Sequence, residues 1–309
     1  MTESLFAFFR VSNYSLYIVE PANRITKDVF LLGNIMIPVY LITGLDLCVL
    51  IDTGMTMMGP YYTQEIAPCL AQRHTPLNVF LTHSHYDHLG SAAYLKRHLP
   101  EFKIGGYYTI DTILKNSHAV ELITSLNLDA ERIMNMNDPE LRFKSFDLDI
   151  PLRGGERFSV GDDELEVIYT PGHTRDSLCY YLKKQRIMFT GEAAGIRLPS
   201  GDILPEFLAS YKSYSASLET LVRYPVDFVA TGHGPVIEGK DAERFFENSL
   251  QATGLFLEKV RRYYRESGNI QEVVERIKHE DYAKSGSGQP ERAYTINLQA
   301  KVRAVIEDK

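Results

Sequence analysis

Three histidines and one aspartate fall within six residues, directly after the apolar run 79–81. They are His83, His85, Asp87 and His88, in the sequence THSHYDHLG. Imidazole and carboxylate together are typical ligands of zinc, iron or manganese, and the absence of a thiolate argues against a structural zinc finger. In an extended chain His83 and His85 lie on one side, while Asp87 and His88 follow the strand and can turn elsewhere. We therefore expect this segment to supply ligands to two metal ions.

Two further histidines and an acid follow other predicted strands. His173 lies in TPGHT and His233 in TGHGP, and their small neighbours let the backbone pass close to a metal cluster. Glu192 ends the apolar run in FTGEA and is the candidate carboxylate between two ions; the alternative is an exposed acid that begins a loop. Asp52 ends the run LID, and we expect it to orient the ligand loop rather than to bind metal.

The composition sets the class of protein. The chain has 309 residues, 44% of them hydrophobic, and a net charge of -7, which disfavours a nucleic-acid partner. No apolar stretch reaches the ~18 residues that cross a bilayer, and the first ten residues lack the features of a signal peptide. The widely spaced Cys48, Cys69 and Cys179 are typical of buried free thiols. We expect a cytoplasmic protein without a membrane partner.

The elements that must position these residues alternate between short apolar strands and amphipathic helices. The predicted strands are 29–33, 37–42, 47–52, 79–82, 165–169, 177–182, 186–190 and 228–230. The predicted helices are a segment from Pro60 onward, one from His88 to Leu99, a helical insertion at 108–136, and 211–224, 241–278 and 294–308. A break at Gly268 and a loop at 284–290 interrupt the last part.

Taken together, the set resembles the metallo-β-lactamase fold superfamily. The residues that carry the resemblance are Asp52, His83-x-His85-x-Asp87-His88, His173, Glu192 and His233, over roughly residues 25 to 240. The resemblance implies an α/β fold, a four-layer αββα sandwich with a helical insertion at about 106–136. It also implies a catalytic domain over 1–240 and a helical C-terminal extension over 241–309 that covers the active-site face.

The same resemblance implies the ligand sets and the cofactors. His83, His85 and His173 would hold a first divalent ion, Asp87, His88 and His233 a second, and Glu192 the bridging position. The ions would be zinc or iron, or else manganese. Most members have Asp where Glu192 stands, so the longer side chain either bridges the two ions or weakens the second one.

The expected reaction is hydrolysis by a metal-activated water, with Asp87 as general base. We expect a small-molecule acyl thioester, or an ester or lactone, because these carbonyls are electrophilic and the chain offers no obvious separate acid. Within the superfamily, the chain resembles thioesterases of the quinolone-signal response type over the segments 31–42, 81–100 and 211–234. This resemblance implies a thioesterase that acts on 2-aminobenzoylacetyl-CoA.

The alternative is a regulatory or interaction protein with a residual hydrolase site, with a homodimer or a regulatory protein as partner. The variant Glu192→Asp discriminates the two hypotheses. If Glu192 has weakened the hydrolase site of a regulatory protein, the variant should gain activity; if Glu192 is an adapted bridging ligand of an enzyme, the variant should lose activity. The sequence does not identify substrate-binding residues.

Overall fold

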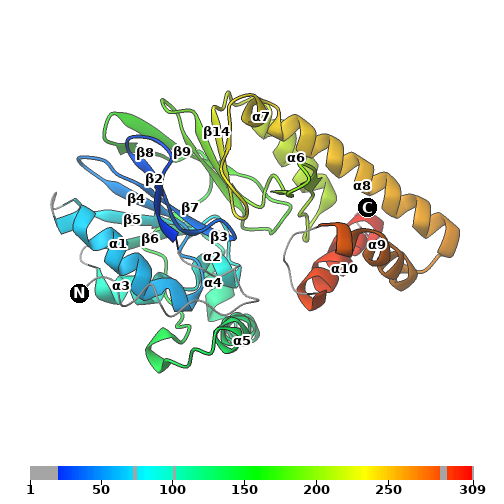
Figure 1. Cartoon of the computed structure of the whole chain (residues 1–309), viewed down its shortest axis with the longest axis horizontal. Helices are drawn as coiled ribbons and strands as arrows, with labels where there is room; N and C mark the ends of the chain where they lie inside the picture. Colours follow the sequence, from blue (N-terminus) through cyan, green and yellow to red (C-terminus); the bar gives the residue numbers. More distant parts are fainter. Residues whose placement is uncertain (1–19, 72–74, 100–101, 286–290, 308–309) are drawn as a thin grey trace.

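The structure is a computed structural model that describes residues 20–71, 75–99, 102–285 and 291–307. The N-terminal ten residues and most of the loop expected at 284–290 lie outside these ranges. Two β-sheets form the centre, and helices lie on their outer sides (Figure 1).

The first sheet holds the strands of the N-terminal half in sequence order. They are β1 (Glu20–Arg24), β2 (Val29–Asn34), β3 (Ile37–Ile42), β4 (Cys48–Ile51), β5 (Leu77–Phe80), β6 (Phe102–Tyr107) and β7 (Ile150–Leu152). The pairs from β1 to β4 are antiparallel, as the predicted meander requires, and those from β4 to β7 are parallel. The carboxyl ends of β4, β5 and β6 therefore meet at one edge of the sheet.

The second sheet has the order β15-β14-β11-β10-β9-β8. These strands are β8 (Arg157–Val160), β9 (Asp163–Tyr169), β10 (Leu178–Leu182), β11 (Ile187–Gly191), β14 (Phe228–Thr231) and β15 (Ile237–Glu238). β11 and β14 are parallel, and β9 runs in their direction because it is separated from β11 by one antiparallel strand. A small hairpin of β12 (Ile196–Arg197) and β13 (Ile203–Leu204) lies outside both sheets.

Every residue of β3 is buried, which requires cover on both faces of the sheet. Val39 and Leu41 pack toward the helices of the N-terminal half, whereas Tyr40 and Ile42 pack between the two sheets. A third apolar cluster joins the outer face of the second sheet to the helices of the C-terminal part. The order of layers is therefore helix, sheet, sheet, helix, and the predicted αββα fold class is confirmed.

Helices cover the first sheet and connect its strands. They are the 3-10 turn η2 (Thr56–Met58), α1 (Gly59–Ala71), α2 (Tyr86–Leu89), α3 (Ala92–His98), α4 (Ile110–Lys115), α5 (Ser117–Ile133) and the 3-10 turn η3 (Pro139–Leu141). The prediction of one helix from His88 to Leu99 was wrong. Two short helices, α2 and α3, stand there and are separated at Gly90 and Ser91. The chain packs closely at this point, where a Cβ on Gly90 would lie 2.7 Å from the carbonyl oxygen of Gly54.

The C-terminal part forms the other outer layer. Its helices are α6 (Tyr211–Leu221), α7 (Lys240–Glu243), α8 (Phe245–Ser267), α9 (Ile270–Ser285) and α10 (Glu291–Glu307). Gly268 ends α8 in the left-handed conformation, and α9 and α10 then fold back beside it (Figure 1). The domain division at residue 240 stays a prediction.

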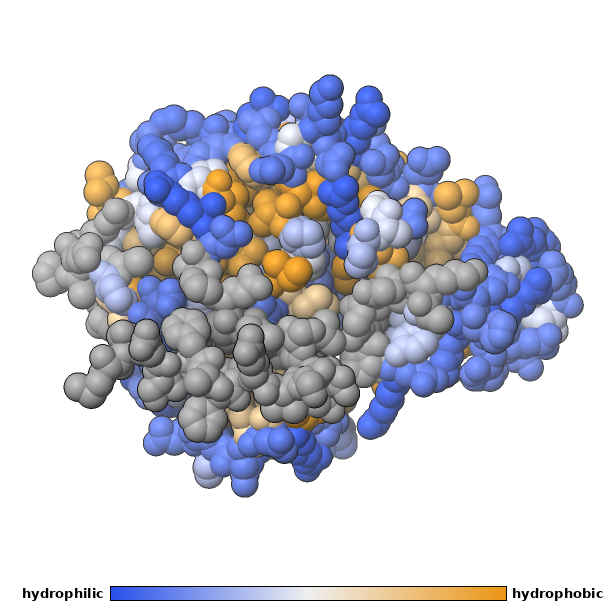
Figure 2. Space-filling model, viewed as in Figure 1, coloured by the Kyte–Doolittle hydropathy of each residue, from blue (hydrophilic) through white to orange (hydrophobic). Residues whose placement is uncertain are grey.

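The surface of these C-terminal helices is mostly hydrophilic in the view of Figure 2, whereas apolar residues gather over the sheets. None of the helices in the described part of the chain has the length and apolar character that a bilayer crossing needs. Cys179 is a buried free thiol, as expected, and Cys48 is buried as well.

Asp149 ties α3 to the parallel edge of the first sheet. Its Oδ2 accepts hydrogen bonds from Lys96 Nζ at 2.6 Å and from the backbone N–H of Ile104 at 2.9 Å. Burial alone would raise the pKa of this carboxyl, but the hydrogen bonds from Lys96 and Ile104 outweigh burial and hold the pKa below its ordinary value.

We expect Asp149→Asn to lower the free energy of unfolding by about 1 kcal/mol at neutral pH, given the partial exposure of the carboxyl. A lowered folded-state pKa stabilises the protein above the unfolded pKa of about 3.9, and this stabilisation is lost as the pH falls through the folded-state value. Urea unfolding at about pH 7 and about pH 3 measures the difference in the free energy of unfolding.

The control is Asp147→Asn, at a side chain that is 83% exposed, and it should change the free energy of unfolding little at either pH. An equal cost of Asp149→Asn at both pH values would contradict the assignment.

Candidate metal centre

The predicted ligands lie where strands of both sheets end. Asp52 follows β4, His83 follows β5, His173 follows β9, Glu192 follows β11 and His233 follows β14. Because these strands share one direction within each sheet, their carboxyl ends place the five side chains at one edge of the sandwich. His85, Asp87 and His88 join them from the turn into α2.

The structure brings all seven predicted metal ligands together. Three groups have ligand atoms within 4.8 Å of one another: His83, His85 and His173; His83, His88 and Glu192; Asp87, His88 and His233. The first and third of these groups are the two sets that the resemblance implies. The second group joins them through Glu192.

Oxygen atoms of the protein hold the Nδ1 side of four of these rings. His173 Nδ1 donates to the carbonyl of Glu206 at 2.5 Å, His88 Nδ1 donates to Asp52 Oδ2 at 2.8 Å, and His233 Nδ1 donates to the carbonyl of Met36. His83 Nδ1 lies 3.0 Å from the hydroxyl of Thr82.

In a neutral imidazole, an oxygen that only accepts fixes the proton on Nδ1 and leaves the Nε2 lone pair free to bind a metal. The Nε2 atoms of these rings therefore turn toward the centre. His85 is the exception, because its Nδ1 faces inward, 3.1 Å from His173 Nε2.

Glu192 lies between the imidazoles. Its Oε1 is 2.9 Å from His88 Nε2 and 2.8 Å from His233 Nε2. Its Oε2 faces His83 Nε2 at 3.6 Å, and neither of these two buried atoms has a hydrogen-bond partner in the described structure. Buried polar atoms of native proteins are almost always satisfied, so a pair of orphaned ligand atoms that face each other fits a metal ion.

Asp52 supports the site from behind. Its carboxylate accepts hydrogen bonds from the backbone N–H of Thr82 at 2.7 Å and from the hydroxyl of Thr82 at 2.8 Å, in addition to the one from His88. Its backbone has a φ of 63°, a region that costs energy for a non-glycine residue and persists where the surroundings enforce it. Asp52 thus connects the strand end of β4 to the loop that bears the ligands.

The buried groups of the site shift one another's pKa values. Burial lowers the pKa of His173 to about 3, and burial together with His88 lowers the pKa of His83. Burial would also lower the pKa of His88 and His233, but the nearby carboxylates, above all Glu192, outweigh burial. They raise the pKa of His88 well above its ordinary value and that of His233 to about 9. Burial would raise the pKa of Glu192, but the imidazoles around it hold that pKa well below its usual range. Without metal, the carboxylates therefore favour the protonated forms of His88 and His233.

Two glycines make room for the ligands. A Cβ at Gly172, which has a φ of 140°, would lie 2.3 Å from the Cα of Tyr214. A Cβ at Gly232 would lie 2.9 Å from Glu192 Oε2. Each glycine precedes a histidine of the site, which explains why the sequence places glycine there.

Sequence reasoning missed two residues that contact the ligand histidines, Thr82 and Glu206. Thr82 belongs to the ligand motif, and its position before His83 was a usable signal. Glu206 gave no such signal, because it lies in an irregular loop.

The chain matches the family model of the metallo-beta-lactamase superfamily over residues 32–233. It is 27% identical over 168 residues to the acyl-coenzyme A thioesterase MBLAC2 of Homo sapiens, a match that covers 50% of this chain and 57% of that protein. It is 27% identical over 192 residues to the atrochrysone carboxyl ACP thioesterase of Aspergillus fumigatus, covering 61% of this chain and 48% of that protein. The chain thus spans about half of the length of these two relatives.

Among solved structures, the fold is similar to that of a metallo-beta-lactamase family protein from Thermus thermophilus. The TM-score is 0.63 at 15% sequence identity, and the match covers 92% of this chain and 94% of that one. At this identity the likeness concerns the fold alone.

We expect Asp52→Asn to weaken Zn²⁺ binding about 10- to 100-fold, because the amide presents N–H groups where the carboxylate now accepts hydrogen bonds from Thr82 and His88. Competition with a chromophoric chelator measures the affinity. The exposed Asp147→Asn is the matched control. An affinity of Asp52→Asn equal to that of the control would show that this carboxylate does not orient the ligands.

Proposed function

Because the chain belongs to the metallo-β-lactamase superfamily, we propose that it is a metal-dependent hydrolase of acyl thioesters. The observation that supports this most directly is the pair of orphaned buried atoms, His83 Nε2 and Glu192 Oε2, which face each other at 3.6 Å. Such a pair has no use in a purely structural core, since each atom would lose its hydrogen bonds to water without compensation.

We propose that the chain binds two divalent ions, each held by its own group of three ligands. His83, His85 and His173 would hold one ion, and Asp87, His88 and His233 the other, with Glu192 between them. The chemistry that such ions supply when bound is polarisation of a carbonyl and a lowered pKa of water. Nitrogen and oxygen ligands without a thiolate suit zinc, iron and manganese.

The protein's own residues orient this centre and leave one side open. His85, Asp87 and His233 are the partly exposed members of the set. The side chains of Asp87 and His233 are 13% and 19% accessible, whereas those of Glu192 and His83 are 4% and 1% accessible. A substrate therefore approaches the side formed by His85, Asp87 and His233. Asp87 Oδ2 lies 3.5 Å from His233 Nε2, and we assign it the role of accepting the proton of the attacking water.

A thioester suits this centre better than an amide does. A thiol with a pKa near 8.5 departs as thiolate without a proton donor, whereas an amine needs one. The names of both relatives described above, an acyl-coenzyme A thioesterase and a carboxyl ACP thioesterase, support the same substrate class. The narrower similarity to thioesterases of the quinolone-signal response type, a homodimer and a regulatory partner stay predictions.

We expect the protein to release free thiol from hexanoyl-CoA, and dialysis against a chelator to abolish this activity. Added Zn²⁺, Fe²⁺ or Mn²⁺ should restore it. His83→Ala should lose more than about 100-fold in kcat/KM, because several kcal/mol of transition-state stabilisation depend on the metal centre.

The control His279→Ala, at an exposed position of α9, should retain full activity. A p-nitrophenyl ester and a γ-lactone serve as comparison substrates. Hydrolysis of the ester or lactone alone would reassign the substrate class. Thiol release that survives complete metal removal would contradict the proposal.

We expect Glu192→Asp to lower both metal affinity and activity about 10-fold or more. The glutamate reaches His88 and His233 at 2.9 and 2.8 Å, and an aspartate from the same backbone falls short by one methylene. Glu258→Asp, an exposed position on α8, is the matched control. A sharp gain of activity would instead favour the regulatory protein with a detuned site.

A further inference from the structure

Lys301 is a buried cation in α10, far in sequence from the metal centre. Its side chain is 2% exposed, and its Nζ donates to Glu206 Oε1 at 2.9 Å and to the carbonyl of Pro205 at 3.1 Å. The Nζ also lies 5.7 Å from the ring centroid of Phe256 in α8. A buried ammonium is costly unless it is paired and hydrogen-bonded. These contacts therefore restrict the positions of the Lys301 and Glu206 side chains.

The other groups of Glu206 are also engaged. Its backbone N–H donates to the hydroxyl of Tyr214 at 3.4 Å, and its carbonyl accepts the Nδ1–H of His173 at 2.5 Å. Lys301 holds the side chain of Glu206 and the carbonyl that precedes it. The remaining carbonyl of Glu206 is thereby directed at the metal-ligand histidine.

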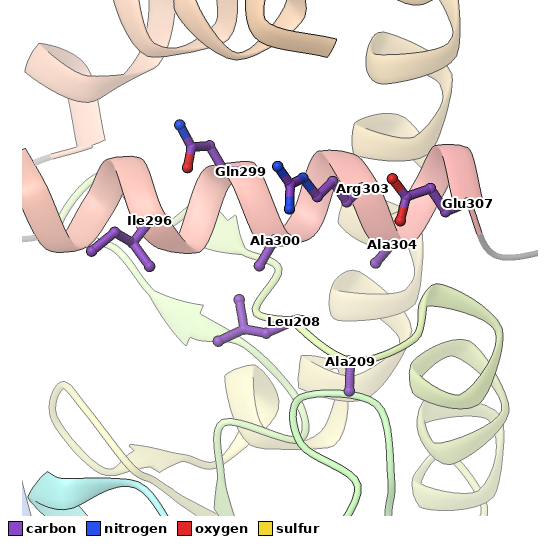
Figure 3. A pocket seen from close by; sticks show the side chains of 8 residues that line it. All are labelled: Leu208, Ala209, Ile296, Gln299, Ala300, Arg303, Ala304 and Glu307. Atoms are coloured by element: carbon purple, nitrogen blue, oxygen red, sulfur yellow. The ribbon is translucent and has the colours of Figure 1, made fainter. Parts of the chain in front are cut away.

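The segment after Glu206 also forms backbone hydrogen bonds to His173 and to the residue before it. The N–H of Leu208 donates to the carbonyl of His173 at 3.2 Å, and the N–H of Ala209 donates to the carbonyl of Gly172 at 3.0 Å. Figure 3 shows α10 lying over this segment, with Ala300 and Ala304 facing it. These two residues, together with Leu208 and Ala209, line a hollow of about 490 Å³. Apolar packing is therefore incomplete along this contact, and Lys301 provides a discrete polar link.

We propose that Lys301 and Glu206 are positioning residues that hold the Glu206 carbonyl against His173 and thereby set the metal affinity of the group His83, His85 and His173. The ring of a ligand histidine is oriented by the hydrogen bond of its other nitrogen, and loss of such a support typically costs 10- to 100-fold in metal affinity. The C-terminal helix α10 thus belongs to the functional unit. The metal part of this inference rests on the proposed function; the effect on the His173 ring does not.

The test compares variants of the full chain that separate positioning from packing. Lys301→Met alone leaves a buried carboxylate unpaired and is expected to be unstable. The double variant Lys301→Met/Glu206→Met replaces the pair by apolar side chains of similar length. Arg303→Met, which likewise replaces a cation by methionine but at an exposed position of α10 two residues away, is the control. Thermal unfolding followed by circular dichroism establishes that the double variant and the control are folded.

The first readout is Zn²⁺ affinity by competition with a chromophoric chelator. In the double variant one Zn²⁺ ion should bind about 10- to 100-fold more weakly than in Arg303→Met, while the other is unchanged. If both ions bind the folded double variant as they bind the control, the pair only fastens α10 and the inference is overturned.

The second readout needs no metal. Long-range ¹H–¹⁵N correlation spectra of the metal-free protein report which nitrogen of His173 carries the proton. We expect only the Nδ1–H tautomer in the wild-type protein and in Arg303→Met, and a mixture of tautomers in the double variant. A wild-type protein with His173 protonated on Nε2, or a double variant with an unchanged tautomer, would overturn the inference whether or not the protein proves to be a thioesterase.

Discussion

The placement of one buried carboxylate dominates this structure. Glu192 is enclosed by His83, His88 and His233, and one of its oxygens has no hydrogen-bond partner among the described residues. An ionised carboxylate in such a position is tolerated only where positive charge compensates it. In the metal-free protein protonated imidazoles supply part of that charge, and divalent ions would supply it more completely.

The rest of the fold serves this arrangement. Two sheets place their strand ends at the same edge, so ligands from both halves of the chain meet although each half supplies only part of the set. Backbone carbonyls and Asp52 then fix the ring orientations by binding the Nδ1 atoms. Because the Nδ1 atoms of these histidines are hydrogen-bonded to the protein, their Nε2 atoms point toward one another.

Much of this could be predicted from the sequence because it is local. The apolar runs predicted most strands, and the spacing of His83, His85, Asp87 and His88 indicated the centre. The single helix expected from His88 to Leu99 was wrong: α2 and α3 are separated at Gly90 and Ser91, and the apolar periodicity of the segment does not report this break. The pairing of Lys301 with Glu206, across 95 residues, likewise depends on how α10 docks and leaves no pattern in the chain.

The metal content of the protein tests the central claim most directly. Elemental mass spectrometry of protein expressed without added metal, normalised to the protein concentration, gives the number of ions per chain. We expect about two ions of zinc, iron or manganese per chain. A protein that carries no transition metal, even after reconstitution with each of these ions, would contradict it.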